Sequence, residues 1–146
     1  MKKIFILLPI VTLIIFTSCS SDDDNGGNQA SIIGAWEYSQ EGTIIGGQEV
    51  LEPYDHEAPE CGNDFIEFSA NGTAVETYFF LNMDSQCETE AFTFSYEVNG
   101  QQITINDDDE VITAEILTLS NTTLKVRTTE EFGGETFVYI VLLTRI

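Results

Sequence analysis

A chain of 146 residues that carries 5 Lys and Arg against 25 Asp and Glu has a formal net charge of −20 at pH 7. This balance excludes nucleic acid as a partner, because neutralising phosphates requires clustered basic side chains. Only Lys125, Arg127 and Arg145 follow Lys2 and Lys3. The acidity suits a soluble domain whose copies repel one another.

The first nineteen residues have the pattern of an export signal. Lys2 and Lys3 precede an apolar run over residues 4–16, and small residues then lead to Cys19. The run is too short for a membrane-spanning helix, which needs about 20 apolar residues. The segment resembles the lipobox of bacterial lipoproteins. This resemblance implies that residues 1–18 are removed and that Cys19 is acylated, palmitate included, to anchor the protein in the outer membrane.

Residues 19–30 read as a tether, because residues 20–29 include no apolar side chain to bury. Without Lys2 and Lys3, 3 basic residues face 25 acidic ones, a net charge of −22. The serines and Asp22–Asp24 directly after Cys19 resemble the export signal of Bacteroidetes lipoproteins, which implies display on the cell surface. A periplasm-facing location stays open as the alternative.

Residues 31–146 are long enough for one domain with a single core. Apolar residues alternate with period two and no helical stripe is present, so the domain is predicted to be all-β. The first strand is expected at Ile32–Ser39 and a second at Ile44–Leu51. An irregular acidic loop should follow at Glu52–Asn63.

Two Asn-Gly pairs are strong hairpin signals. A two-residue loop at Asn71–Gly72 pairs Phe68 with Val75, and the same loop at Asn99–Gly100 pairs Tyr96 with Ile103. The first turn places on one face Ile66, Phe68, Val75, Phe79 and Leu81. The second places on one face Phe92, Phe94, Tyr96, Val98, Ile103 and Ile105.

Three further strands are expected at Val111–Leu119, Thr122–Glu130 and Glu135–Arg145, the last two joined at Gly133 and Gly134. Short strands joined by tight turns, with no helical crossovers, predict an antiparallel meander that closes into a barrel of about eight strands. No substantial helix is expected apart from the signal peptide.

Residues 31–146 resemble the lipocalin-like domain found in Bacteroidetes lipoproteins. The resemblance is carried by the Gly-x-Trp strand at residues 33–36, the CGNDFIEFSANG segment at 61–72, FSYEVNGQQITI at 94–105 and AEILTLSNTTLKV at 114–126. It implies a barrel with an interior that can hold a ligand, and no catalytic residue. It also implies that Trp36 closes one end of the barrel and that Arg145 packs over its ring.

Two cysteines remain once Cys19 is assigned to the lipid anchor. Cys61 and Cys87 would face an oxidising export compartment, where disulfides persist, so we expect them to be paired. Two free thiols are the alternative.

No residue pattern indicates catalysis, a metal site or a cofactor. His56 is the only histidine, and Asp55 could orient it, but no serine or cysteine carries a nucleophile motif. The acidic run at residues 107–110 lacks the spaced ligands of a calcium loop and reads as a solvated turn. We therefore expect a protein that is not an enzyme.

Two functions remain at this point. In the first, the lipid-anchored barrel binds a small apolar ligand. Its lining would be Ile66, Phe68, Val75, Phe79, Phe94, Tyr96 and Ile103. In the second, the barrel is filled by its own Phe and Tyr side chains, and its surface binds a protein or glycan. A cavity of about 300 Å³ or more would favour the first.

Overall fold

The computed structural model describes residues 30–107 and 110–146. The predicted signal peptide, Cys19 and nearly all of the tether lie outside these residues, as do Asp108 and Asp109 of the acidic run. The described part contains nine β-strands and no helix. The strands are β1 (Gly34–Ile45), β2 (Gln48–Pro53), β3 (Phe65–Phe68), β4 (Thr73–Leu81), β5 (Cys87–Asn99), β6 (Gln102–Asp107), β7 (Glu110–Leu119), β8 (Thr123–Phe132) and β9 (Glu135–Arg145).

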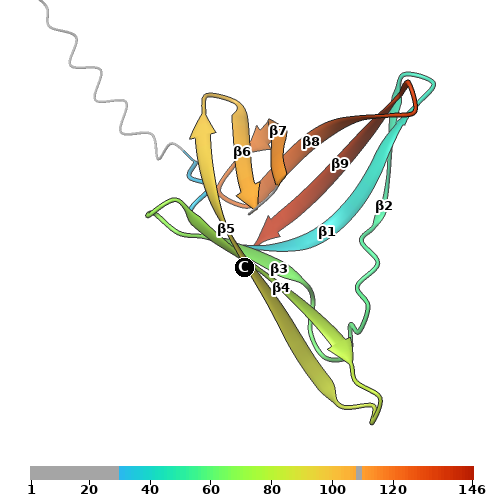
Figure 1. The fold of residues 1–146 in the computed structure, drawn as a ribbon, viewed down its shortest axis with the longest axis vertical. Helices are drawn as coiled ribbons and strands as arrows, with labels where there is room; N and C mark the ends of the chain where they lie inside the picture. Colours follow the sequence, from blue (N-terminus) through green and yellow to red (C-terminus); the bar gives the residue numbers. More distant parts are fainter. Residues whose placement is uncertain (1–29, 108–109) are drawn as a thin grey trace, which may run out of the picture.

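The strands form an antiparallel meander that closes on itself, as predicted. Strands β3 to β9 pair in sequence order, β1 pairs with β3, and β9 returns to pair with β1. This makes a closed barrel of eight strands, with β2 as an extra strand on the outer half of β1 (Figure 1). The predicted all-β, lipocalin-like barrel is therefore confirmed.

The barrel is closed at one end and splayed at the other. Only the first residues of β1 pair with β3, whereas its later residues pair with β2. The β4–β5 hairpin and the arm made of β1, β2, β8 and β9 consequently diverge from the closed end, as Figure 1 shows. A long loop, residues 54–64, connects β2 to β3 between them.

The first two strands differ from the sequence prediction. The expected strand Ile44–Leu51 is divided by a turn at Gly46 and Gly47, so that Ile45 pairs with Gln48. The first strand runs through to Ile45 instead of ending at Ser39. The two glycines form the two-residue loop of a hairpin, a signal of the same kind as Asn-Gly.

The hairpin near Asn99 is shifted by two residues from the predicted register. Tyr96 pairs with Ile105 and Asn99 with Gln102, so the loop is Gly100–Gln101. Gly100 has a φ of 61°, which the first central position of a type II′ turn requires. Because side chains alternate with period two, a shift of two keeps every residue on its predicted face.

The hairpin near Asn71 is shifted by one residue, and this shift reverses a face. Phe68 pairs with Ala74 instead of Val75, and Ile66 pairs with Glu76. The loop spans four residues, with the Ser69 amide donating to the Thr73 carbonyl at 2.8 Å. The predicted register is therefore wrong.

The Asn71 side chain accounts for the longer loop. Its Oδ1 accepts a hydrogen bond from the Thr73 amide at 3.0 Å, and the Gly72 amide donates to the Ser69 carbonyl at 3.1 Å. Such Asx bonds offer the backbone an alternative to the two-residue turn. The inward residues of β4 are consequently Ala74, Glu76 and Tyr78.

Trp36 fills the closed end of the barrel. Its side chain is 0% exposed, and its indole Nε1 donates to the carbonyl of Ile32, which is also buried. The Arg145 guanidinium carbon lies 4.1 Å from the centre of the Trp36 ring, in the arrangement that the resemblance implies. The same guanidinium donates to the carbonyls of Ile33 and Ser31, so it fixes the segment before β1 next to the tryptophan.

The glycine before this tryptophan is required by the arginine. Gly34 has a φ of 124°, and a Cβ at this position would lie 2.5 Å from a guanidinium nitrogen of Arg145. Any other residue would displace the arginine or strain the backbone. The Gly-x-Trp spacing therefore follows from the close packing of Arg145.

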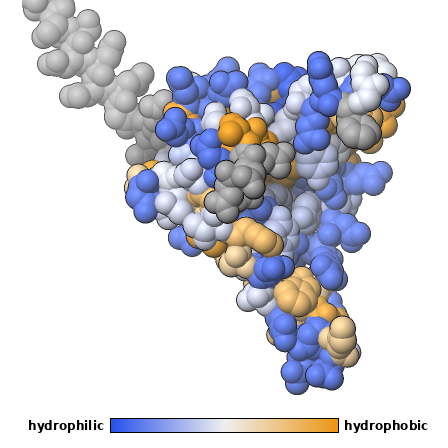
Figure 2. Space-filling model, viewed as in Figure 1, coloured by the Kyte–Doolittle hydropathy of each residue, from blue (hydrophilic) through white to orange (hydrophobic). Residues whose placement is uncertain are grey.

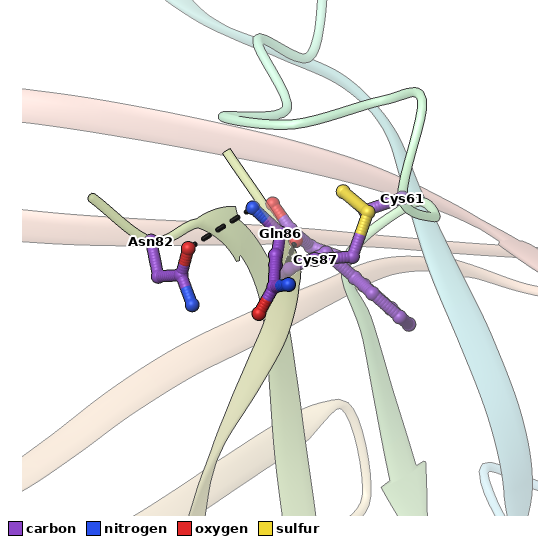
Figure 3. The surroundings of a disulfide bond; sticks show 6 residues. Cys61, Asn82, Gln86 and Cys87 are labelled. Carbon is purple, nitrogen blue, oxygen red and sulfur yellow. Dashed lines mark hydrogen bonds between the residues drawn. A yellow bond between two sulfur atoms is a disulfide. The ribbon is translucent and has the colours of Figure 1, made fainter. Parts of the chain in front are cut away.

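The predicted disulfide is confirmed. Cys61 in the long loop is bonded to Cys87 at the start of β5, with a Cα–Cα distance of 5.5 Å (Figure 3). The neighbouring turn is organised by Asn82, whose Oδ1 accepts hydrogen bonds from the amides of Asp84 and Gln86. The bond ties the loop between β2 and β3 to the far end of the β4–β5 hairpin.

Polar side chains cover most of the face seen in Figure 2, and apolar ones lie among them on the projecting β4–β5 hairpin. Met83 at the tip of this hairpin is fully exposed. Across residues 30–107 and 110–146, no helix has the length and apolar character needed to cross a membrane.

Candidate functional site

The splayed end of the barrel contains a cavity of about 520 Å³. Its walls come from β1, β3 to β9 and the long loop, so it opens where the strands diverge. More than half of its lining residues are aromatic or acidic. The lining residues are Tyr38, Tyr54, Ile66, Glu76, Tyr78, Phe92, Phe94, Ile105, Ile112, Val126, Thr128, Glu130, Tyr139 and Val141.

A second, smaller pocket of about 120 Å³ lies deeper in the barrel. It shares Tyr38, Ile66, Val126 and Thr128 with the larger cavity, among others, and adds the apolar side chains of Phe68, Ile103, Ala114, Leu124 and Leu143. The interior therefore changes from polar and aromatic at the mouth to almost entirely apolar near the closed end.

Glu76 occupies the inner wall because of the one-residue shift at the Asn71 turn. Its carboxylate accepts a hydrogen bond from the Tyr38 hydroxyl of β1, on the other side of β3. Tyr78, two residues along the same strand, also lies in the wall, where burial and the nearby Glu76 carboxylate raise its pKa. Two phenols from different strands thus converge on one carboxylate.

The tyrosines of the mouth stay protonated far above neutral pH. Burial, followed by the nearby charges of Asp64 and Glu76, raises the pKa of Tyr54 to about 12. Burial also raises the pKa of Tyr38 and of Tyr78 well above the ordinary value, with Glu76 adding to both. Burial and the hydrogen bond to Glu41 do the same for Tyr139. The mouth therefore presents neutral phenol rings.

The long loop contributes Tyr54 and anchors it through stacking. The Tyr54 ring stacks on Tyr38 with centroids 4.9 Å apart, and His56 meets Tyr54 edge-on at 4.9 Å. The His56 Nδ1 accepts a hydrogen bond from the Asp64 amide at 3.0 Å, so this nitrogen carries no proton and its 3.4 Å contact with the Asp64 carboxylate is not an ion pair.

Asp64 holds this loop against the barrel. It is 2% exposed, its Oδ1 accepts from the Phe79 amide at 2.8 Å, and its carbonyl accepts from the Tyr38 amide at 3.1 Å. His56 and Asp64 thus make structural hydrogen bonds. Asp55 lines a separate surface pocket and does not contact His56 through any hydrogen bond in the described residues.

The basic side chains of the domain all lie away from the cavity. Lys125 pairs with Glu49, Arg127 pairs with Glu115, and Arg145 covers Trp36. None of the three lines the cavity. In the described part of the chain, no group of three or more His, Cys, Asp or Glu could hold a metal ion.

The predicted lining is distributed over four places: the large cavity, the deep pocket, the closed end and the outer face of β4. Ile66 and Phe94 line the large cavity, and Phe68 and Ile103 line the deep pocket. Tyr96 is buried at the closed end, where its hydroxyl donates to the Ser69 carbonyl at 2.8 Å and its ring meets Phe68 edge-on.

Val75 and Phe79 are on the outer face of β4, because their neighbours Ala74, Glu76 and Tyr78 point inward. Phe79 packs outside the barrel near Phe65, with ring centroids 6.4 Å apart, and its ring limits the space beside Gly62 of the long loop. The long loop thus covers the apolar Phe79 side chain on the outer face of β4, which reduces the cost of its lying outside the barrel.

The sequence reasoning missed the polar lining. Tyr38, Tyr54, Tyr78, Tyr139 and Glu76 line the cavity, yet none was among the expected lining residues. Tyrosine is amphipathic, and Tyr38 occupies the next position of β1 on the same face as the buried Trp36, which was a usable signal. Glu76 gave no such signal, because the face of β4 opposite to it is the more apolar one.

Several solved structures resemble the chain at low sequence identity. Solved structures that resemble the chain include lobster apocrustacyanin A1, with 13% identity over 84% of this chain and 64% of that one and a TM-score of 0.48. Bovine odorant binding protein in complex with undecanal has 16% identity over 82% and 74%, with a TM-score of 0.45. The siderocalin Ex-FABP has 14% identity over 78% and 73%, with a TM-score of 0.44.

No curated protein sequence matches the chain. The family model described as the lipocalin-like domain matches residues 32–126, which span the strands from β1 into β8 and include Trp36, the disulfide and most of the cavity wall. The chain therefore belongs to the lipocalin-like domain family.

Proposed function

We propose that the protein is a lipid-anchored lipoprotein of the cell envelope whose barrel binds a small ligand with a large apolar part. The observation that carries the binding proposal is the cavity of about 520 Å³, which exceeds the roughly 300 Å³ at which small-molecule sites begin. The apolar pocket beneath it would accept the end of an extended ligand.

The rival function, a filled barrel that acts only through its surface, is disfavoured by the same cavity. Aromatic side chains do fill the closed end, where Phe68, Tyr96 and Trp36 are buried. At the open end they line the walls and leave the centre empty. Ligand binding is therefore the function that the interior supports best.

Binding is tested with the neutral apolar probe N-phenyl-1-naphthylamine, whose emission rises in apolar surroundings. The Cys19→Ala protein is used so that no lipid of its own competes. We expect saturable binding, weakened at least about tenfold, or about 1.4 kcal/mol, by Thr128→Phe. Thr128 lines both pockets, so a phenyl ring there should fill them.

The matched control is Thr129→Phe, because Thr129 is exposed and points away from the cavity. Unchanged affinity in the control and lost affinity in Thr128→Phe would support the proposal. Equal affinity in both variants, or no saturable binding by the parent protein, would refute it.

The lipid anchor rests on the sequence of residues 1–19 alone. A Cys19→Ala variant should appear in the soluble fraction after a high-salt wash, whereas the parent protein should remain with membranes. If the variant also remains with membranes, the anchor proposal fails.

Surface display is tested separately from anchoring. Replacing Asp22, Asp23 and Asp24 with Ala should reduce protease accessibility on intact cells and leave the thermal midpoint unchanged, since these residues lie in the proposed tether. Unaltered accessibility would favour the plain tether and leave the orientation in the envelope open to the periplasm-facing alternative.

A further inference from the structure

Among the described residues, the polar end of the cavity contains carboxylates and no basic side chain. Glu76 and Glu130 line the cavity, and Glu41 accepts a hydrogen bond from Tyr139 at its edge. The three basic residues of the domain make their contacts elsewhere, with Glu49, Glu115 and Trp36. A cleft lined by charge of one sign focuses the potential and concentrates ions of the opposite sign.

The aromatic rings around these carboxylates add a second attraction for cations. The ring faces of Tyr and Phe carry negative potential, and several rings around one site form the cage that recognises organic ammonium groups. Tyr38, Tyr54, Tyr78 and Tyr139 come from four different elements, and Phe92 meets Tyr78 edge-on with centroids 6.0 Å apart.

The hydroxyls of two of these tyrosines are already directed toward carboxylates. Tyr38 donates to Glu76, and Tyr139 donates to Glu41. Among the described residues, a ligand carboxylate would therefore meet like charges and no basic side chain. An anionic head group, such as that of a fatty acid, does not suit this mouth.

We infer that the cavity selects an amphiphile whose head group is an organic cation, such as an alkylammonium, and whose tail is apolar. The head would lie among Glu76 and the tyrosines, and the tail would enter the apolar pocket between Ile66 and Leu143. This inference rests on the proposed ligand-binding function and adds to it the charge of the ligand.

The test compares ligands that share one tail and differ in head group. Decyltrimethylammonium, decanoate and decanol, each below its micellar concentration, compete with N-phenyl-1-naphthylamine for the Cys19→Ala protein. We expect the ammonium to displace the probe at a concentration at least about tenfold lower than decanoate does, with decanol between them. Displacement by decanoate at an equal or lower concentration would overturn the inference.

Glu76→Gln tests the carboxylate itself. The amide keeps an oxygen that accepts the Tyr38 hydroxyl and removes the charge. The advantage of the ammonium over decanoate should shrink about tenfold, while the affinity of the neutral probe stays the same. Glu67→Gln is the matched control, because Glu67 lies on the outer face of neighbouring β3 and is exposed.

A second variant keeps the test decisive if Glu76→Gln does not fold. Glu130→Gln removes a charge from an exposed part of the cavity wall and should reduce the ammonium preference by a smaller factor. If the neutral probe binds but head-group preference is absent, the inference fails and the proposed function stands. If the probe does not bind at all, the proposed function itself fails.

Discussion

The two ends of the barrel are built from the same strands and differ in what fills them. At the closed end, Trp36 is fully buried, and Arg145 covers it while binding the carbonyls of residues 31 and 33. At the open end, tyrosines and Glu76 surround a cavity. At the closed end, the hydrogen bonds are made to backbone carbonyls of the chain. At the open end, the carboxylates that line the cavity have no basic partner among the described residues.

The difference teaches that stability and binding are separated along the barrel axis. Nearly complete burial makes the closed end costly to alter, since lost packing and the resulting cavity both destabilise. Most side chains around the open cavity are partly or fully exposed, so their substitution should change binding more than folding. Variants at the two ends can test this division directly.

The largest effect on stability should come from Trp36→Ala. Removing a fully buried Trp should lower the free energy of unfolding by about 3–5 kcal/mol, measured by urea denaturation. Phe92→Ala at the open end, where the ring is 45% exposed, should cost about 1 kcal/mol. Equal losses at the two positions would contradict the division between the ends.

Removal of the disulfide should come next. Replacing both Cys61 and Cys87 with Ala opens a link across 26 residues and should lower stability by about 3 kcal/mol on the chain-entropy account. The same loss should appear when the parent protein is reduced. The bond would be energetically irrelevant if the reduced and oxidised proteins had the same denaturation midpoint.

Arg145→Met should cost about 1–2 kcal/mol, because it keeps an apolar stem and removes the cation–π contact and two hydrogen bonds to carbonyls. Arg127→Met is the control, since Arg127 makes an ion pair with Glu115 at the surface. Its loss should be below about 1 kcal/mol. A comparable loss in the control would show that Arg145 does not hold the closed end.

The smallest predicted effect is a loss of folding stability at alkaline pH. The pKa of Tyr54 is 10.0 when exposed and is raised to about 12 in the folded protein, so the folded state keeps a proton that the unfolded state loses between these values. Stability should therefore be full below pH 10 and decline as pH rises toward 12.

Tyr54→Phe should flatten this decline by about 1 kcal/mol or less, because the partly exposed group is screened by solvent. The measurement is denaturation at several alkaline pH values, with phenolate absorbance as the titration signal. Tyr96→Phe at the closed end is the comparison, since burial is the cause of its raised pKa. An unchanged slope in Tyr54→Phe would contradict the assignment.

The sequence alone predicts those features of the fold that depend on short residue patterns. Alternation predicts the strands, and cysteine number and compartment predict the bond between Cys61 and Cys87. The Gly-x-Trp resemblance leads to Trp36 and Arg145, which pair directly across β1 and β9. These features depend on short patterns that tertiary contacts do not override.

The part of the polar wall that β4 supplies could not be predicted, because it depends on a register set by one side chain. The Asn71 Oδ1 bond to the Thr73 amide lengthens the loop, and a one-residue shift then exchanges the two faces of β4. Packing of the long loop against Phe79 makes the exchange tolerable. No local propensity favours Glu76 over Val75 as an inward residue.

The seam between β1 and β9 has a consequence for how the chain reaches its native state. Trp36 pairs with Arg145, so the contact that completes the barrel joins the first strand to the last of the nine. Such long-range pairing slows folding, because loop-closure entropy is spent before the contact forms. Strands β1 to β8 cannot close the barrel without β9, and until β9 pairs, the edges of β1 and β8 remain open to pairing with other chains.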